Sequence, residues 1–115
     1  MPPVLWQPAE DARTATRLGQ FMDLCEARSG LTFDGYDALW RWSTGAGLEE
    51  FWSAVWEFFG VRASEPYARV LDARVMPGAR WFDDARLNYA EHALRAAADG
   101  GDDVALVGVS QKSMN

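Results

Sequence analysis

The sequence predicts a mainly α-helical domain with about four helices and one or two strands. Apolar residues recur every three or four positions in several segments, which is the spacing of one helix face. Glycines or capping residues stand at the ends of these segments. The one continuous apolar run typical of a buried strand lies near the last residue, at 104–109. The 115 residues suffice for one small domain and not for two.

The first predicted helix covers residues 11–28. Its apolar residues recur at helical spacing and therefore lie on one face. They are Leu18, Phe21, Met22 and Cys25. Gly30 is expected to end the helix, because glycine adopts the left-handed conformation at little cost. A shorter helix is expected over residues 36–42, with Asp34 as its cap and Asp37 near its positive end.

The strongest helical pattern runs from residue 48 to residue 59, between Gly47 and Gly60. Its large apolar side chains occupy an arc of about 160° at a helical rotation of about 100° per residue. They are Phe51, Trp52, Val55, Trp56, Phe58 and Phe59. The opposite side carries Glu50, Ser53 and Glu57. Because covering one small core needs an arc of only about 100°, we expect this helix to be packed from two directions.

The pattern changes after Gly60. Residues 67–76 are irregular, with a short strand around Val70 as an option, and Pro77-Gly78 is typical of a turn. A loop is expected through residues 81–84.

The last predicted helix covers residues 88–98. Asn88 and Glu91 have the spacing of a capping box. Gly100-Gly101 is expected to break the chain before the apolar run at 104–109, which is interpreted as a buried strand. One strand has no partner in the few residues that follow, so the sequence is expected to be truncated. We therefore expect a helical domain over residues 1–103 and the start of a second domain over residues 104–115.

Composition and charge exclude several classes of protein. The formal net charge is −6, and an acidic domain repels the phosphates of nucleic acids. No apolar stretch approaches the length of a membrane span, and the N-terminus lacks the pattern of a signal peptide. The single cysteine fits a reducing compartment, so a cytoplasmic location is expected. Fifteen aromatic residues, six of them tryptophan, exceed what a small core usually buries, which indicates a further packing partner.

The glycine clusters, the cysteine and the histidine do not predict a phosphate-binding loop, a zinc site or a nucleophile. Gly45-Ala46-Gly47 and Gly100-Gly101 have no lysine nearby and no strand before them, so they are interpreted as helix boundaries and not as phosphate loops. One cysteine and one histidine do not make a zinc site. Cys25 is interpreted as a buried, inert thiol in preference to a nucleophile. His92 is expected to be solvated or hydrogen-bonded.

The adjacent carboxylates, two arginines and the tryptophan pairs are interpreted as structural and not as parts of a binding or catalytic site. The adjacent carboxylates are Glu49-Glu50, Asp83-Asp84 and Asp102-Asp103. Neighbouring residues on a helix point in different directions, so these pairs are interpreted as solvated charges and not as acid/base pairs. Arg80 and Arg86 could contact an anionic cofactor, but ion pairs with Asp83 and Asp84 are preferred. Packing is preferred over a ligand cage for the pairs Trp40/Trp42 and Trp52/Trp56.

Two extended motifs, together with the opening residues, carry a resemblance to a known family. The first motif comprises residues 36–43 (YDALWRWS) and 50–59 (EFWSAVWEFF). The second comprises residues 75–82 (VMPGARWF) and 85–91 (ARLNYAE). With Leu5-Trp6-Gln7-Pro8, they resemble the N-terminal region of the acetoacetyl-CoA synthetases, which belong to the AMP-forming acyl-CoA synthetases. The resemblance extends from about residue 5 to residue 109, and residues 110–115 match nothing in the family.

The resemblance implies a helical N-terminal cap on an α/β adenylate-forming enzyme. Such a parent enzyme uses ATP and Mg²⁺ to form acetoacetyl-AMP and transfers the acyl group to coenzyme A, a reaction of ketone-body and fatty-acid metabolism. The family's phosphate loop, ribose-binding aspartate and catalytic lysine come later in its sequence. No catalytic, cofactor-binding or metal-binding residue is therefore expected in this chain.

The residues that match the family motifs are expected to pack or to cap. Trp81, Phe82 and Leu87 are expected to be apolar anchors, and Asn88 a helix cap. The expected partner is the adenylation domain of the same polypeptide. A free-standing interaction module with the same fold, binding a protein partner through its apolar face, remains the alternative.

Overall fold

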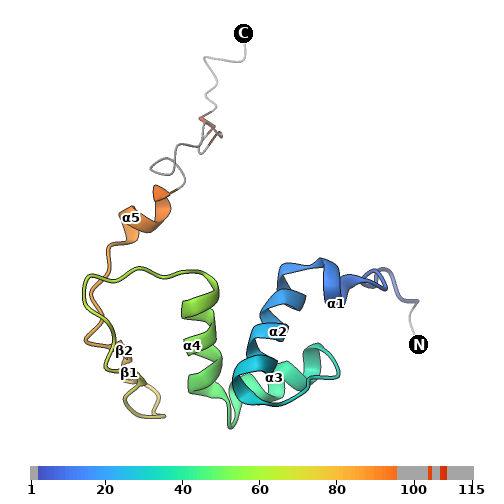
Figure 1. Ribbon diagram of the computed structural model, residues 1–115, viewed down its shortest axis with the longest axis horizontal. Coiled ribbons are helices and arrows are strands. Elements are labelled where there is room, and N and C mark those ends of the chain that lie inside the picture. The colour runs from blue at the N-terminus through green and yellow to red at the C-terminus, as the bar shows by residue number, and fades with distance from the viewer. Residues whose placement is uncertain (1–2, 96–103, 105–106, 109–115) are drawn as a thin grey trace.

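The computed structural model describes residues 3–95, 104 and 107–108. In chain order the elements are α1 (Ala12–Ala15), α2 (Arg17–Ser29), α3 (Tyr36–Thr44), α4 (Leu48–Phe58), β1 (Arg69–Leu71), β2 (Trp81–Asp83) and α5 (Tyr89–Ala93). Helix α4 contacts α2 and α3 on one side and β1 on the other, and β1 and β2 form an antiparallel hairpin beyond which α5 lies (Figure 1). The predicted mainly helical fold is confirmed.

The predicted helix over residues 11–28 is wrong in one respect, because it is broken at Thr16. This residue is extended, with φ −105° and ψ 157°, and its Oγ1 accepts a hydrogen bond from the N–H of Gly19. The same Oγ1 donates to the carbonyl of Ala12 at 2.7 Å. A Cβ on Gly19 would lie 1.9 Å from the carbonyl oxygen of Arg13. The break therefore depends on a capping threonine followed by a glycine that allows α1 and α2 to approach closely.

The end of α2 and the start of α3 match the sequence prediction, whereas α3 continues to Thr44, two residues beyond its predicted end. Gly30 ends α2 in the left-handed conformation at φ 70°, and its N–H donates to the carbonyl of Glu26, as predicted. The prediction that Asp34 caps α3 is wrong. Gly35 occupies the cap position, and no side chain bonds to the first turn of the helix.

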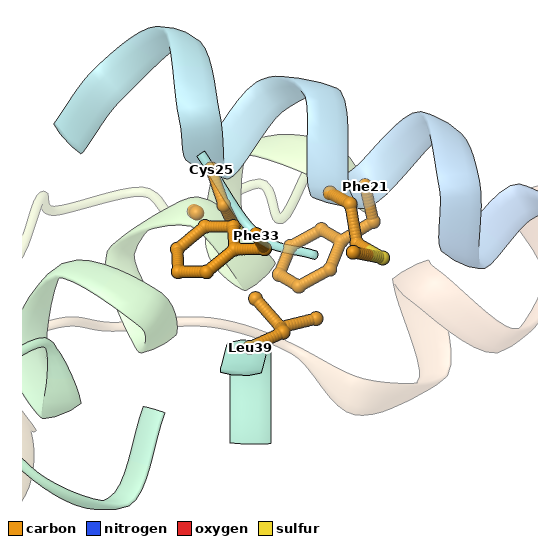
Figure 2. Packing of buried hydrophobic residues seen from close by; sticks show 6 residues of the cluster. Phe21, Cys25, Phe33 and Leu39 are labelled. Carbon is orange, nitrogen blue, oxygen red and sulfur yellow. The ribbon is translucent and has the colours of Figure 1, made fainter. Parts of the chain in front are cut away.

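The core lies between α2, α3 and α4. Its buried apolar residues are Phe21, Met22, Cys25, Phe33, Leu39 and Ala54. Figure 2 shows Phe21 and Cys25 on α2 directed toward Leu39 of α3, with the ring of Phe33 beside them. The ring of Phe21 meets those of Phe51 and Phe58 edge-on, each at a centroid distance of 5.3 Å. Edge-to-face aromatic pairs of this kind add about 1 kcal/mol beyond the burial of their area.

Helix α4 is packed from two directions, as its wide apolar arc predicts. Phe51 and Phe58 face α2, whereas the rings of Trp52 and Trp56 meet aromatic rings of the hairpin region. Its polar side is also occupied, because the guanidinium of Arg28 on α2 binds Glu57 and donates to Ser53 Oγ at 3.0 Å.

The predicted loop through residues 81–84 is wrong, because residues 81–83 form strand β2. This strand pairs antiparallel with β1, with Arg69 opposite Asp83 and Leu71 opposite Trp81. The option of a strand around Val70 is therefore confirmed, and Pro77-Gly78 lies in the connection between the strands. Phe82 has a φ of 50°, which is rare for an aromatic residue in a strand.

Helix α5 covers Tyr89–Ala93, inside the predicted helix over residues 88–98, and Arg95 is again helical after a turn at Leu94. Asn88 caps it as predicted, since its Oδ1 accepts from the N–H groups of Ala90 and Glu91. Residues 96–98, Gly100-Gly101 and half of the predicted strand at 104–109 (residues 105, 106 and 109) lie outside the described residues. Within the described part of the chain, no helix has the length and apolar character needed to cross a membrane.

Candidate functional site

The glycines at positions 45 and 47 serve the end of α3. The N–H of Gly45 and the N–H of Gly47 both donate to the carbonyl of Trp42, at 3.2 and 3.0 Å. A Cβ on Gly47 would lie 2.0 Å from the indole of Trp42. The backbone N–H groups that a phosphate would need are therefore already bonded, and the interpretation of this cluster as a helix boundary is confirmed.

The two residues with the most reactive side chains, Cys25 and His92, lie on different helices, α2 and α5. Cys25 is fully buried in the core, and burial raises the pKa of its thiol to about 11. It is the inert thiol that the sequence predicts. The Nε2 atom of His92 accepts a hydrogen bond of 2.8 Å from the N–H of Arg62, so the hydrogen-bonded role is confirmed. Among the described residues, no three His, Cys, Asp or Glu side chains converge as metal ligands.

The carboxylates of the hairpin are engaged in ion pairs. Asp83 Oδ2 accepts from Arg69 at 2.8 Å and lies 3.5 Å from Arg80, as expected for Arg80. The stronger partner of Arg80 is Asp72, eight positions earlier, with an Nε–Oδ2 distance of 3.1 Å. The expectation that Arg86 pairs with Asp83 or Asp84 is wrong. Arg86 pairs with Glu65 at 3.3 Å, because the two residues face each other across a β-bridge.

Asp72 holds the turn end of the hairpin, next to the Leu71–Trp81 pair, and the sequence analysis missed it. Its Oδ1 accepts from the N–H of Arg80 at 2.8 Å and from the N–H of Ala73 at 2.6 Å. The backbone N–H and guanidinium of Arg80 lower the pKa of the Asp72 carboxyl. The sequence does contain a signal for this pairing, because Asp72 precedes and Arg80 follows the Pro77-Gly78 turn.

Two aromatic surfaces remain, one on each side of α4. The first is the hairpin cluster, which consists of Trp52, Trp56, Tyr67, Trp81 and Phe82. Trp52 contacts Trp81 at a centroid distance of 5.6 Å, and the rings of Trp56, Tyr67 and Phe82 contact one another at 4.8 to 5.3 Å, so both sets pack between α4 and the hairpin. This arrangement is packing, as predicted for Trp52 and Trp56, and Phe82 serves as the expected anchor.

The second surface is a groove between α2, α3 and α4, here called the helix groove. Its volume is about 460 Å³, and Phe21, Leu39 and Phe51 contribute to its lining. Four large side chains along it stay between 46 % and 62 % exposed. They are Leu18, Tyr36, Trp40 and Phe59. Leu18 and Phe59 were assigned to apolar helix faces by the sequence, and the structure leaves both open to solvent.

One cation lies at the helix groove. The guanidinium of Arg17 stands over the rings of Phe58 and Phe59, at 5.3 and 5.9 Å from their centroids. Among the described residues, Arg17 forms no ion pair with a carboxylate. The groove thus combines open aromatic surface with an available positive charge, which suits it to binding.

Comparison with known sequences identifies a family for most of this structure. The sequence profile of the family described as "Acetyl-coenzyme A synthetase N-terminus" matches residues 36–93. That range extends from the first residue of α3 to the last residue of α5.

Similar proteins are found in animals and bacteria. An acetoacetyl-CoA synthetase of Danio rerio is 37% identical over 80% of this chain, and one of Rhizobium meliloti is 36% identical over 84%. A malonamoyl-CoA synthetase of Penicillium aethiopicum is 34% identical over 79% of the chain. The chain spans only 12–15% of the length of these relatives.

A solved structure shares the fold. The acetoacetyl-CoA synthetase from Streptomyces lividans superimposes with a TM-score of 0.78 at 50% identity, over 86% of this chain and 15% of its own. The chain belongs to the acetyl-coenzyme A synthetase N-terminus family, and it matches the N-terminal region of acetoacetyl-CoA synthetases.

Proposed function

We propose that this chain is the N-terminal, non-catalytic region of an enzyme that ligates acetoacetate to coenzyme A while ATP is converted to AMP and pyrophosphate. The observation that carries the proposal is the 50% identity with the Streptomyces lividans synthetase over 86% of this chain. In this proposal residues 1–103 form the N-terminal domain, and residues 104–115 begin the adenylation domain. The acetoacetate specificity belongs to the proposal, because one relative is a malonamoyl-CoA synthetase.

In this proposal ATP, Mg²⁺ and coenzyme A bind to the remainder of the enzyme and not to this chain. The N–H groups of Gly45 and Gly47 are bonded to the carbonyl of Trp42, and the hairpin carboxylates are paired with arginines. No reaction step is therefore assigned to this chain, and its contribution to the enzyme is structural: it covers part of the larger body. A reducing, cytoplasmic setting is part of the proposal, because it suits the free thiol of Cys25.

A chimeric enzyme tests the proposal. Residues 3–95 of this chain replace the matching N-terminal region of the Streptomyces lividans synthetase, and ATP–pyrophosphate exchange is measured with acetoacetate. We expect the chimera to retain the exchange activity of the natural enzyme and the pure 115-residue chain to show none. Exchange by the 115-residue chain alone, or a soluble chimera without activity, would contradict the proposal.

The exposed helix groove favours one alternative, a free-standing module that binds another protein. The coding sequence directly downstream distinguishes the two functions. A reading frame that continues into a Gly/Ser/Thr-rich adenylation domain supports the proposed function, and a stop codon at this position supports the module.

A further inference from the structure

We infer that the helix groove is the docking surface for an apolar segment from the remainder of the synthetase polypeptide, and that this segment places a carboxylate beside Arg17. The inference rests on the proposed function and deepens it, because it names the surface of the cap that the larger body covers.

The first argument is the exposed apolar surface. Tyr36 and Trp40 of α3 and Phe59 at the end of α4 are 62%, 54% and 54% exposed, although they line the same groove. The floor beneath them, formed by Phe21 and Leu39, is buried. A contiguous aromatic rim over a packed floor is typical of a surface that another protein segment covers.

The second argument is charge. Arg17 stands over Phe58 and Phe59, and among residues 3–95 it has no carboxylate partner. The other arginines of α1 and α2 are paired, Arg13 with Asp23 and Glu26, and Arg28 with Glu57. A cation held against aromatic rings at the edge of an apolar groove is complementary to an acidic group on the occupant.

The third argument is the length of the relatives. The chain covers only 14–15% of the acetoacetyl-CoA synthetases that it matches, so most of such a polypeptide lies outside it. A segment of the same polypeptide is present at high effective concentration, which favours it over a second copy or an unrelated protein.

Hydroxyl-radical footprinting tests the inference on the free 115-residue chain and on the chimera described above. Oxidation of Tyr36, Trp40 and Phe59 is measured by mass spectrometry. We expect the rate of their oxidation to be about fivefold lower in the chimera than in the free chain. The reason is that half-exposed rings would become the buried core of an interface. The free chain should show the same oxidation at all protein concentrations.

Three variants of the chimera test the charge. Arg17→Glu is expected to restore the oxidation of Trp40, because it places a carboxylate against the acidic group of the occupant. Arg17→Lys keeps the charge and should keep the protection. Arg62→Glu reverses an exposed charge outside the groove and should leave the oxidation of Trp40 unchanged. Equal protection in the Arg17→Glu and Arg62→Glu variants would show that no carboxylate lies beside Arg17.

The outcomes separate this inference from the proposed function. An active chimera whose groove is oxidised as fast as in the free chain overturns the docking surface and leaves the proposed function intact. A soluble, inactive chimera contradicts the proposed function.

Protection that rises with the concentration of the free chain identifies a second copy as the occupant. If the chimera does not fold, the same footprint on the natural Streptomyces lividans enzyme decides, since exposed groove residues there contradict the inference.

Discussion

The indole of Trp56 packs against the ring of Phe82 at a centroid distance of 4.8 Å, and this contact joins α4 to the hairpin. Tyr67 contacts both rings, at 5.0 and 5.3 Å. Phe82 reaches this position from a backbone with φ 50°, a conformation that costs about 1–3 kcal/mol for a residue other than glycine. The aromatic contacts therefore stabilise the hairpin against the strain of its own strand.

Truncating Trp56 should separate the hairpin from the helices. Trp56 is half-buried, so Trp56→Ala should lower the free energy of unfolding by about 2–4 kcal/mol, near the lower end for a fully buried tryptophan. Urea unfolding followed by circular dichroism measures the change. Trp6→Ala is the matched control, because Trp6 is 78% exposed, and it should change stability by less than about 0.5 kcal/mol. A stable Trp56→Ala protein with a selective loss of ligand affinity would favour the ligand cage instead.

Adding a methyl group at Gly19 should disturb the junction of α1 and α2. The new Cβ would lie 1.9 Å from the carbonyl oxygen of Arg13, so Gly19→Ala should destabilise the domain by about 1–3 kcal/mol. Gly108→Ala is the control, since no atom lies within 4 Å of its new Cβ. Thermal unfolding of both variants measures the difference, and equal melting temperatures would contradict the close approach seen here.

The ion pair between Asp72 and Arg80 should make the hairpin sensitive to acid. The folded pKa of Asp72 is lowered from 3.8, so its contribution to stability is present above that value and is lost as the pH falls through the lowered pKa. Asp72→Asn should be less stable than the wild type at neutral pH, and the difference should shrink in acid. Thermal unfolding across the acidic range measures this effect, and a pH-independent difference would refute it.

The thiol of Cys25 should react slowly in the folded protein. It is fully buried and its pKa is about 11, so alkylation in mildly alkaline buffer should require unfolding. The ordinary thiol pKa is 9.0, and the raised folded value means that stability declines as the pH rises from 9.0 toward about 11. Mass spectrometry after iodoacetamide treatment, with and without urea, measures the reactivity. Rapid labelling without urea would show that the core opens readily.

The sequence predicted those features that depend on local spacing. The apolar arc of α4, the left-handed Gly30 and the cap at Asn88 all follow from residues within one or two helical turns. The break at Thr16 was missed because it depends on the approach of Gly19 to Arg13. Strand β2 was missed because Phe82 adopts a conformation that β-propensity does not indicate.

The candidate docking surface was predictable only in part. An excess of aromatic residues indicated a packing partner, and the width of the α4 arc indicated two packing directions. Which rings remain open was not predictable, because Trp56 and Phe59 lie on the same helical arc and only the hairpin decides which one is covered. The role of Arg17 also depends on α2 lying against α4, which brings its guanidinium over Phe58 and Phe59.

Helix α4 contacts α2 and α3 on one side and β1 on the other, so few of its side chains can be replaced without disturbing a neighbouring element. Ala54 near its middle has no exposed surface, so even one added methylene must displace a neighbouring element. The outer positions of α3, such as Asp37 and Arg41, meet fewer constraints from within this domain. Substitutions should therefore be tolerated least along α4. Natural variation in related N-terminal domains should be found first at exposed positions such as those of α3, and last in α4.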